Sequence, residues 1–283
     1  MNENEFKIPS GIVTFLFTDI EGSTRLSQDN HDTLLIALEK HNSIIRNAVE
    51  SHNGFVFKTI GEAFCCAFNN VSDAILASVE AQIDLDQEIP DEAKVSVRMG
   101  IHSGNAEWNG NDYMGYITLA RTNRVMSAAN GGQILISESS HDLIYEKTYF
   151  TNSHDEISFR DMGERRLKDL IQPMKLYQAV SDKITADFPP LKTLDARPNN
   201  LPIQLTSFIG REEVMQQLKN LFSKTRLLTI TGSGGSGKTR LAMQTGADMI
   251  DDFANGVFLV ELAHVTDPVL IPLTIMNSLG IKE

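Results

Sequence analysis

Apolar and polar residues alternate in blocks along the first part of the chain. An uninterrupted apolar run at 11–17 indicates a buried strand, and apolar positions at helical spacing indicate a helix over 31–51. Two short apolar runs, 55–60 and 63–68, flank Gly61-Glu62, which is a tight turn signal. These blocks predict a strand, a helix and a β-hairpin in that order.

The same mixture continues to about residue 180. The expected elements are helices at 71–85 and 116–129 and strands at 95–101, 133–137 and, as a terminal pair, within 159–180. Strands and helices mixed in this way, with at least one hairpin, predict an α+β fold in which helices pack on one sheet.

A second pattern begins after a proline-rich stretch at 181–207. Clustered prolines favour an extended, semi-stiff spacer. We therefore expect a first domain at 1–180, a linker at 181–207 and a further segment at 208–283. That segment predicts a helix at 212–223, a strand at 226–231, a glycine-rich turn, a helix from Lys238 and a strand at 257–262.

Composition narrows the class of protein. A formal net charge of −12 argues against a nucleic acid partner for these residues, although one nucleotide needs only a few placed cations. No apolar run reaches the length of a membrane-spanning helix, and the N-terminus shows no signal region. The two cysteines, Cys65 and Cys66, are adjacent and cannot join distant segments. These features predict a soluble protein of the cytoplasm.

Three groups of polar residues stand beside the expected elements. Asp19 ends the first strand before a Gly-Ser-Thr turn, Glu62 lies at the hairpin tip after Lys58, and Asp112 precedes the third helix. A carboxylate is a hard oxygen ligand for a metal, and amides near a helix start suit a phosphate. Taken singly, each group also fits an ordinary capped turn, a surface ion pair or a solvated helix face.

Taken together and in order, the groups resemble the class III nucleotidyl cyclase catalytic domain. The resemblance spans Ile12 to Val180 and rests on FLFTDIEGSTRL, FKTIGEAFCCAF, VRMGIHSG and DYMGYITLARTNRVMSAANGGQILIS. It implies a ferredoxin-like sandwich whose domains pair head to tail as a homodimer. Each active site would then draw residues from both partners.

The resemblance also implies roles for individual residues. Asp19, the Ile20 carbonyl and Glu62 would bind Mg²⁺ or Mn²⁺, facing residues of the other subunit. Lys58 and Asp112 would read the adenine edge, because lysine donates to a ring nitrogen and aspartate accepts from the amine. Guanine presents the opposite pattern, so the pair favours ATP. Arg124 would stabilise the reacting phosphates.

Two departures from the family pattern bear on activity. Glu62 stands where the family has an aspartate, and the extra methylene can misplace a metal ligand. Ala120 stands where the family helix has an asparagine, and Asn123 lies on roughly the same helix face as a substitute. The sequence therefore leaves two readings: a slow adenylate cyclase, or a nucleotide-binding dimerisation module without catalysis.

The glycine-rich turn in the second segment matches the phosphate-binding loop pattern. Gly232, Gly237, Lys238 and Thr239 occupy its defining positions, and the alternative is a flexible glycine-serine linker. With SFIGREEVMQQL and NGVFLVELAHVTDP, the segment resembles the start of STAND-type signal-transduction ATPases with an NB-ARC-like core. This implies ATP as a second ligand, and a partial α/β P-loop domain in a fragment or a truncated product.

Overall fold

The computed structural model describes residues 8–23, 31–90, 94–144, 149–150, 156–170, 172–202 and 211–281. The chain forms two compact units. One comprises Met1–Arg165 with Met174–Lys192, and the other comprises Arg166–Pro173 with Thr193–Glu283. Within the described ranges, no helix combines the length and the apolar content that crossing a bilayer requires.

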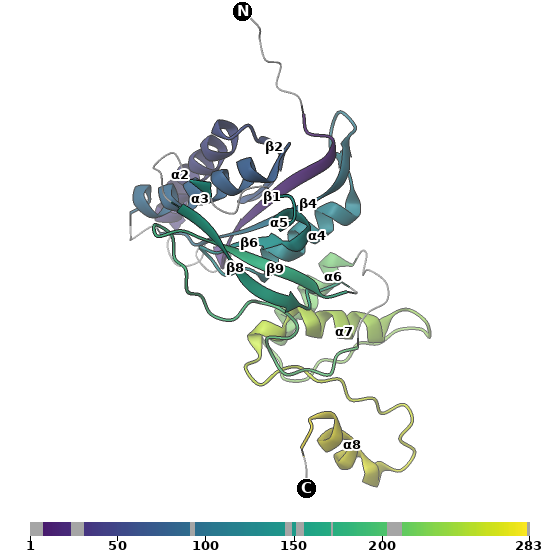
Figure 1. The fold of residues 1–283 in the computed structure, drawn as a ribbon. Helices are drawn as coiled ribbons and strands as arrows, with labels where there is room; N and C mark the ends of the chain where they lie inside the picture. The colour runs from purple at the N-terminus through teal and green to yellow at the C-terminus, as the bar shows by residue number, and fades with distance from the viewer. Residues whose placement is uncertain are drawn as a thin grey trace, which may run out of the picture. The chain divides into compact units, whose positions relative to one another are not determined.

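The first unit is built on one mixed sheet (Figure 1). Its elements are β1 (Gly11–Ile20), α2 (His31–Ser51), β2 (Phe55–Ile60), β3 (Ala63–Phe68), α3 (Val71–Glu88), β4 (Val97–Trp108), β5 (Tyr113–Met114), α4 (Tyr116–Ala128), β6 (Ile134–Ser137), α5 (Glu138–His141), β7 (Tyr149–Phe150), β8 (Glu156–Arg165) and β9 (Met174–Val180). The strand order is β2-β3-β1-β4-β6-β9-β8-β7, and β5 pairs with β4. The first six of these elements, with the order β2-β3-β1-β4, form a ferredoxin-like βαββαβ core.

Period-two alternation gives the central strand β1 two buried faces. Leu16 and Ile20 belong to the main core with residues of α2 and α3, whereas Val13, Phe15 and Phe17 belong to a second apolar cluster. Because both faces are covered, β1 reads in the sequence as a continuous apolar run. The predicted α+β class, the strand at 11–17 and the hairpin around Gly61-Glu62 are confirmed.

Helix α4 lies unusually close to strand β4 because two glycines stand beneath it. A Cβ atom placed on Gly100 would lie 2.2 Å from the backbone nitrogen of Met126, and one on Gly104 would lie 2.8 Å from Oγ1 of Thr118. Only glycine fits such an approach. The position of α4, which carries Asn123, is therefore fixed by the sequence of the strand under it.

The proline-rich stretch is divided between the two units. Residues 181–192 belong to the first unit, where the Leu191 side chain is buried, and the rest belongs to the second unit. The backbone nitrogen of Lys192 donates to the carbonyl of Ala128 at 2.9 Å. The first half of the predicted linker is therefore packed against the sheet domain, because its apolar and backbone groups find partners there.

The second unit contains helices but little sheet. Its elements are α6 (Glu212–Phe222), α7 (Lys238–Asp248), η2 (Ile250–Asp252), η3 (Pro268–Leu270) and α8 (Ile271–Ser278). Nζ of Lys219 in α6 lies 2.9 Å from Oδ2 of Asp248 in α7, and Leu241 is buried. An apolar cavity of about 350 Å³ lies among α6, α7 and neighbouring extended segments, with Leu218, Phe222, Leu228 and Val257 in its lining.

The prediction of regular strands at 226–231 and 257–262 is wrong. Among the described residues of this unit, the only ladder contact is a single parallel bridge between Asn199 and Val257. A strand forms hydrogen bonds to a neighbouring strand rather than within itself. The predicted helices at 212–223 and from Lys238 do form, because a helix bonds its own backbone.

Candidate functional site

Asp19 lies next to the end of β1, opposite Arg98 on β4. The antiparallel register pairs these two residues. Both Nε and Nη2 of Arg98 donate to Oδ2 of Asp19, at 2.9 and 2.5 Å, and both side chains are mostly buried. The guanidinium therefore fixes one carboxylate oxygen, and Oδ1 is the oxygen that would hold a cation.

Glu62 lies at the tip of the β2–β3 hairpin, where Gly61 adopts a left-handed φ of 60°. Its charge acts on a buried histidine of α2. Burial lowers the pKa of His41, and a hydrogen bond to Asn42 and the charges of Glu62 and Asp19 partly offset this. The two candidate metal ligands thus lie within electrostatic range of the same imidazole ring.

Lys58 and Asp112 form a direct ion pair although 54 positions separate them. Nζ of Lys58 donates to Oδ2 of Asp112 at 2.8 Å, while Oδ1 accepts from the backbone nitrogen of Tyr113 at 2.8 Å. These hydrogen bonds lower the pKa of Asp112, and the same pairing raises the pKa of Lys58. Both groups are therefore charged at neutral pH.

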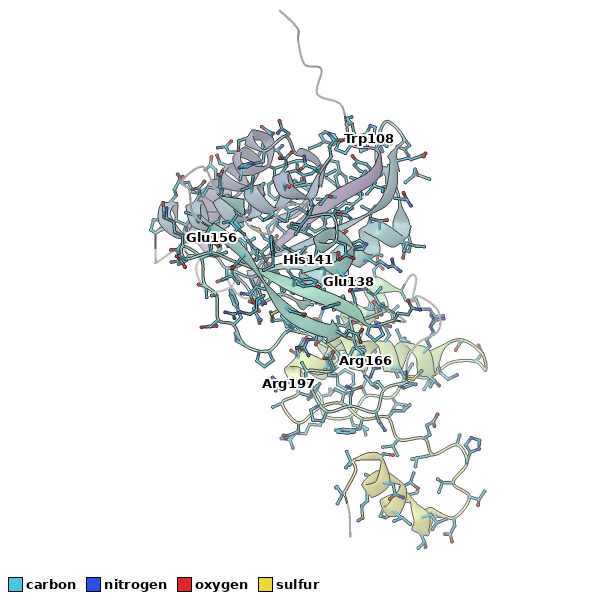
Figure 2. The ribbon with its side chains drawn as sticks, viewed as in Figure 1. Trp108, Glu138, His141, Glu156, Arg166 and Arg197 are labelled. Atoms are coloured by element: carbon cyan, nitrogen blue, oxygen red, sulfur yellow. The ribbon has the colours of Figure 1, made fainter. Side chains whose placement is uncertain are left out.

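The wall beside this pair is apolar. Lys58 is in register with Cys65 of β3, whose pKa is raised to about 11 by burial. The ring of Tyr113 packs 4.9 Å from that of Phe57 and 5.2 Å from that of Trp108. Trp108, the last residue of β4, is labelled in Figure 2. Lys58 and Asp112 are thus a polar pair at the edge of an aromatic cluster, which suits recognition of a flat, hydrogen-bonding base.

Asn123 and Arg124 lie in the C-terminal half of α4, and both are half-buried. Ala120, on the same helix, has no polar side-chain group. Thr122 is buried and donates through Oγ1 to the carbonyl of Thr118 at 2.8 Å. Asn123 and Arg124 are thus among the accessible polar side chains of α4, and exposed Arg121 lies about one turn before Arg124.

The oxygen donors present fit a hard divalent cation. Among the described residues, no three His, Cys, Asp or Glu side chains gather into a complete metal site. Asp19 and Glu62 supply two carboxylates, and Mg²⁺ is commonly held by one or two carboxylates together with water and substrate phosphates. Asp19 and Glu62 thus provide oxygen donors of the kind that Mg²⁺ binds.

The glycine-rich loop of the second unit closes on its own lysine. Nζ of Lys238 donates to the carbonyl oxygens of Gly232 at 3.0 Å and Ser233 at 2.8 Å. Gly237 adopts a φ of 80° at the N-terminus of α7, which begins at Lys238 and includes Thr239. Because a φ of 80° lies in the left-handed region, the turn before α7 depends on glycine at this position.

The sequence does not predict two residues, Arg98 and Glu21, that make hydrogen bonds at or beside the candidate metal ligands. Arg98 is a lone cation within an apolar strand, which is a usable signal, but its pairing with Asp19 depends on strand register. Glu21 accepts a hydrogen bond from the backbone nitrogen of Gly131 at 2.6 Å across 110 positions. No local pattern predicts such a long-range contact.

Comparison with known proteins identifies the family of the first unit. The family model of the adenylate and guanylate cyclase catalytic domain matches residues 7–178. An uncharacterized protein of Mycobacterium tuberculosis is 31% identical over 206 residues, which cover 72% of this chain and 68% of that protein. An adenylate cyclase of Schizosaccharomyces pombe is 29% identical over 192 residues, covering 59% of this chain and 11% of that protein.

Solved structures show the same fold. An adenylate cyclase of Trypanosoma brucei, in its monomeric state, superposes with a TM-score of 0.54 at 24% identity, covering 68% of this chain and 98% of that structure. The adenylyl cyclase CyaB of Pseudomonas aeruginosa superposes with a TM-score of 0.51 at 20% identity, covering 62% of this chain and 96% of that structure.

Proposed function

The chain belongs to the adenylate and guanylate cyclase catalytic domain family, and from this premise we propose that it converts ATP to cyclic AMP and pyrophosphate. The observation that carries the choice of ATP is the ion pair between Lys58 and Asp112 at 2.8 Å. An ammonium that donates and a carboxylate that accepts match the ring nitrogen and amine of adenine. Guanine offers the reverse pattern at both positions.

The remaining site residues support an in-line attack of the ribose 3′-hydroxyl on the α-phosphate. Mg²⁺ or Mn²⁺ held by Asp19, the Ile20 carbonyl and Glu62 would supply charge stabilisation at the phosphates. Arg98 orients the Asp19 carboxylate, so this ligand needs no rearrangement. Arg124 offers a planar fork of donors to a phosphate oxygen, and Asn123 offers an amide on the same helix.

The site is expected to be completed by a second copy of the chain. Lys58, Asp112 and Arg124 of one subunit would face Asp19 and Glu62 of the other in a head-to-tail homodimer. Glu62 in place of aspartate and Ala120 in place of asparagine predict slow turnover, because a displacement of about 1 Å costs roughly a hundredfold in rate. The alternative function, a nucleotide-binding dimerisation module without catalysis, rests on these same two residues.

Product formation by the full chain tests the proposal. Wild type is incubated with ATP and either Mg²⁺ or Mn²⁺, and cyclic AMP and pyrophosphate are measured. We expect cyclic AMP from wild type and a loss of at least about a hundredfold in Asp19→Asn. Asp187→Asn is the matched control, because Asp187 also pairs with an arginine, at 3.0 Å from Arg160, but on an exposed surface.

Glu62→Asp separates the two readings of the site. If the longer side chain limits the rate, the substitution raises turnover without changing ATP affinity. No product from wild type and none from Glu62→Asp with either metal would contradict catalysis. Retained ATP binding in that case would support the dimerisation module.

A second candidate function belongs to the second unit. We propose that Gly232, Gly237, Lys238 and Thr239 bind the phosphates of ATP with Mg²⁺, as part of a STAND-like regulatory ATPase. The two hydrogen bonds from Lys238 to loop carbonyls support this, because they hold the ammonium where phosphate oxygens would replace those carbonyls. Equilibrium dialysis of full-length Lys238→Ala should show one ATP fewer per chain than wild type or the control Lys224→Ala. An unchanged count would contradict this site.

A further inference from the structure

Glu21 follows the candidate metal ligands directly and is tied down at three points. Its backbone nitrogen donates to the carbonyl of Ser96 at 2.9 Å. Its Oε2 accepts from the backbone nitrogen of Gly131 at 2.6 Å, and its Oε1 pairs with Nζ of Lys192. The turn after Asp19 is therefore attached to distant parts of the first unit.

Gly131 leaves room for this carboxylate and for little else. A Cβ atom at Gly131 would lie 2.8 Å from Oε2 of Glu21 and 2.4 Å from Cβ of Ser96. The Glu21 carboxylate therefore packs closely against the turn between α4 and β6. The negative charge on the carboxylate strengthens the hydrogen bond from the Gly131 amide.

Lys192 contacts both Glu21 and the end of helix α4. Its backbone nitrogen donates to the carbonyl of Ala128, the last residue of α4, at 2.9 Å, while its ammonium pairs with Glu21. The preceding residue, Leu191, is buried and anchors the segment. One lysine therefore contacts both the turn that follows the metal ligands and the helix that carries Arg124.

The Lys192–Glu21 pair is more buried than a typical surface ion pair, so solvent screens its interaction less. The exposed fractions of the side chains are 23% for Lys192 and 37% for Glu21, against 43% for Lys94 and 61% for Asp86 in a surface pair of the same unit. Partly buried pairs with extra hydrogen bonds are screened less than exposed ones. Groups that orient metal ligands in this manner commonly change metal affinity when they are removed.

We propose that Glu21, held by Lys192 and the Gly131 amide, is a positioning residue that fixes the turn directly after the candidate metal ligands Asp19 and Ile20 at the end of β1. The inference rests on the proposed metal role of Asp19. Lys192 is also the last residue of the first unit, so the chain passes directly from this pair into the longer segment of the second unit, Thr193–Glu283. Removing either member should loosen the turn while leaving the Asp19 carboxylate in place.

Mn²⁺ binding to the full chain, measured by electron paramagnetic resonance in the presence of ATP, tests the proposal without needing turnover. Asp19→Asn defines the Asp19-dependent portion of the binding. Glu21→Gln and Lys192→Met should each weaken that portion about tenfold. The double variant should be no weaker than the singles by more than about twofold, because the two residues act as one unit. Asp86→Asn, in the exposed pair with Lys94, should bind as wild type does.

Kinetics and unfolding distinguish positioning from general damage. Where product forms, Glu21→Gln should raise the metal concentration needed for half-maximal rate more than it lowers the rate at saturating metal. Its denaturant midpoint should stay close to that of Asp86→Asn. Unchanged Mn²⁺ affinity in both variants, or wild type without Asp19-dependent binding, would overturn the positioning role. A wild type that binds Mn²⁺ in this manner but forms no product would overturn only the proposed function.

Discussion

The two units contain similar apolar runs, but the run is buried as a strand in the first unit and is largely exposed, without a regular strand, in the second. In the first unit, Phe15 of β1 is fully buried between neighbouring strands and helices. In the second unit, Leu227, in a run equally typical of a strand, is 84% exposed. Helices form in both units because their hydrogen bonds are local, whereas strands form only where a neighbouring strand supplies the other half of each bond. A segment with high strand propensity therefore forms a regular strand only where a neighbouring strand can pair with it.

The largest expected effect is on stability. Phe15→Ala should lower the free energy of unfolding of the first unit by about 3–5 kcal/mol, because it opens a cavity beside Tyr113 and Phe57. Leu227→Ala should change unfolding by less than about 0.5 kcal/mol. Denaturant titrations measure both changes, followed by the fluorescence of Trp108, the single tryptophan, for Phe15→Ala and by circular dichroism for Leu227→Ala. Equal losses in the two variants would remove the contrast between the units.

The next effect depends on pH. Burial, and then the charge of Arg121, lower the pKa of His102 from 6.5 to about 4, and Oγ of Ser137 lies 2.8 Å from its Nδ1. The unfolded chain therefore takes up this proton at a higher pH than the folded chain does. Stability from the neutral ring should be complete above pH 6.5 and should fall by about 3 kcal/mol as the pH drops to about 4.

Unfolding of wild type and His102→Gln across this pH range isolates the contribution of the ring. The variant should have a shallower slope between pH 4 and 6.5. Identical slopes would show that His102 does not titrate with folding.

A smaller effect concerns two glycines. Gly100→Ala should destabilise the first unit by about 1–3 kcal/mol, because the new methyl group meets the backbone of α4 at Met126. Gly234→Ala places a methyl group in open space in the second unit and should cost much less. Denaturant midpoints of the first and second variants, followed by Trp108 fluorescence and by circular dichroism respectively, measure both. Similar shifts would mean that α4 is not seated on the glycine.

Much of the first unit could be predicted from the sequence, and its long-range contacts could not. The apolar run before Asp19 predicted a buried strand, and Gly61-Glu62 predicted the hairpin, because both signals are local. The pairing of Arg98 with Asp19 and of Lys192 with Glu21 depends on sheet register and on the path of the chain after β9. In the second unit the local signal at 226–231 was clear, and the missing element was a pairing partner.

The motifs around Lys58 and Asp112 gave a different kind of information. Nothing in the spacing of these residues shows that they meet, and their expected partnership came from resemblance to a family. The structure brings them to 2.8 Å, and the rings of the neighbouring residues Phe57 and Tyr113 pack 4.9 Å apart. Family resemblance thus grouped two residues that residue patterns alone do not group, and the structure shows them in contact.

The choice of ATP by the Lys58–Asp112 pair is tested most directly by the ratio of cyclic AMP formed from ATP to cyclic GMP formed from GTP. Wild type should form cyclic AMP in excess. The reversed pair, Lys58→Glu with Asp112→Lys, keeps opposite charges in contact but presents the pattern that guanine requires, so the ratio should fall at least about tenfold. A ratio that is unchanged by the reversal, or a wild type that prefers GTP, would contradict the proposed role of Lys58 and Asp112 in selecting ATP.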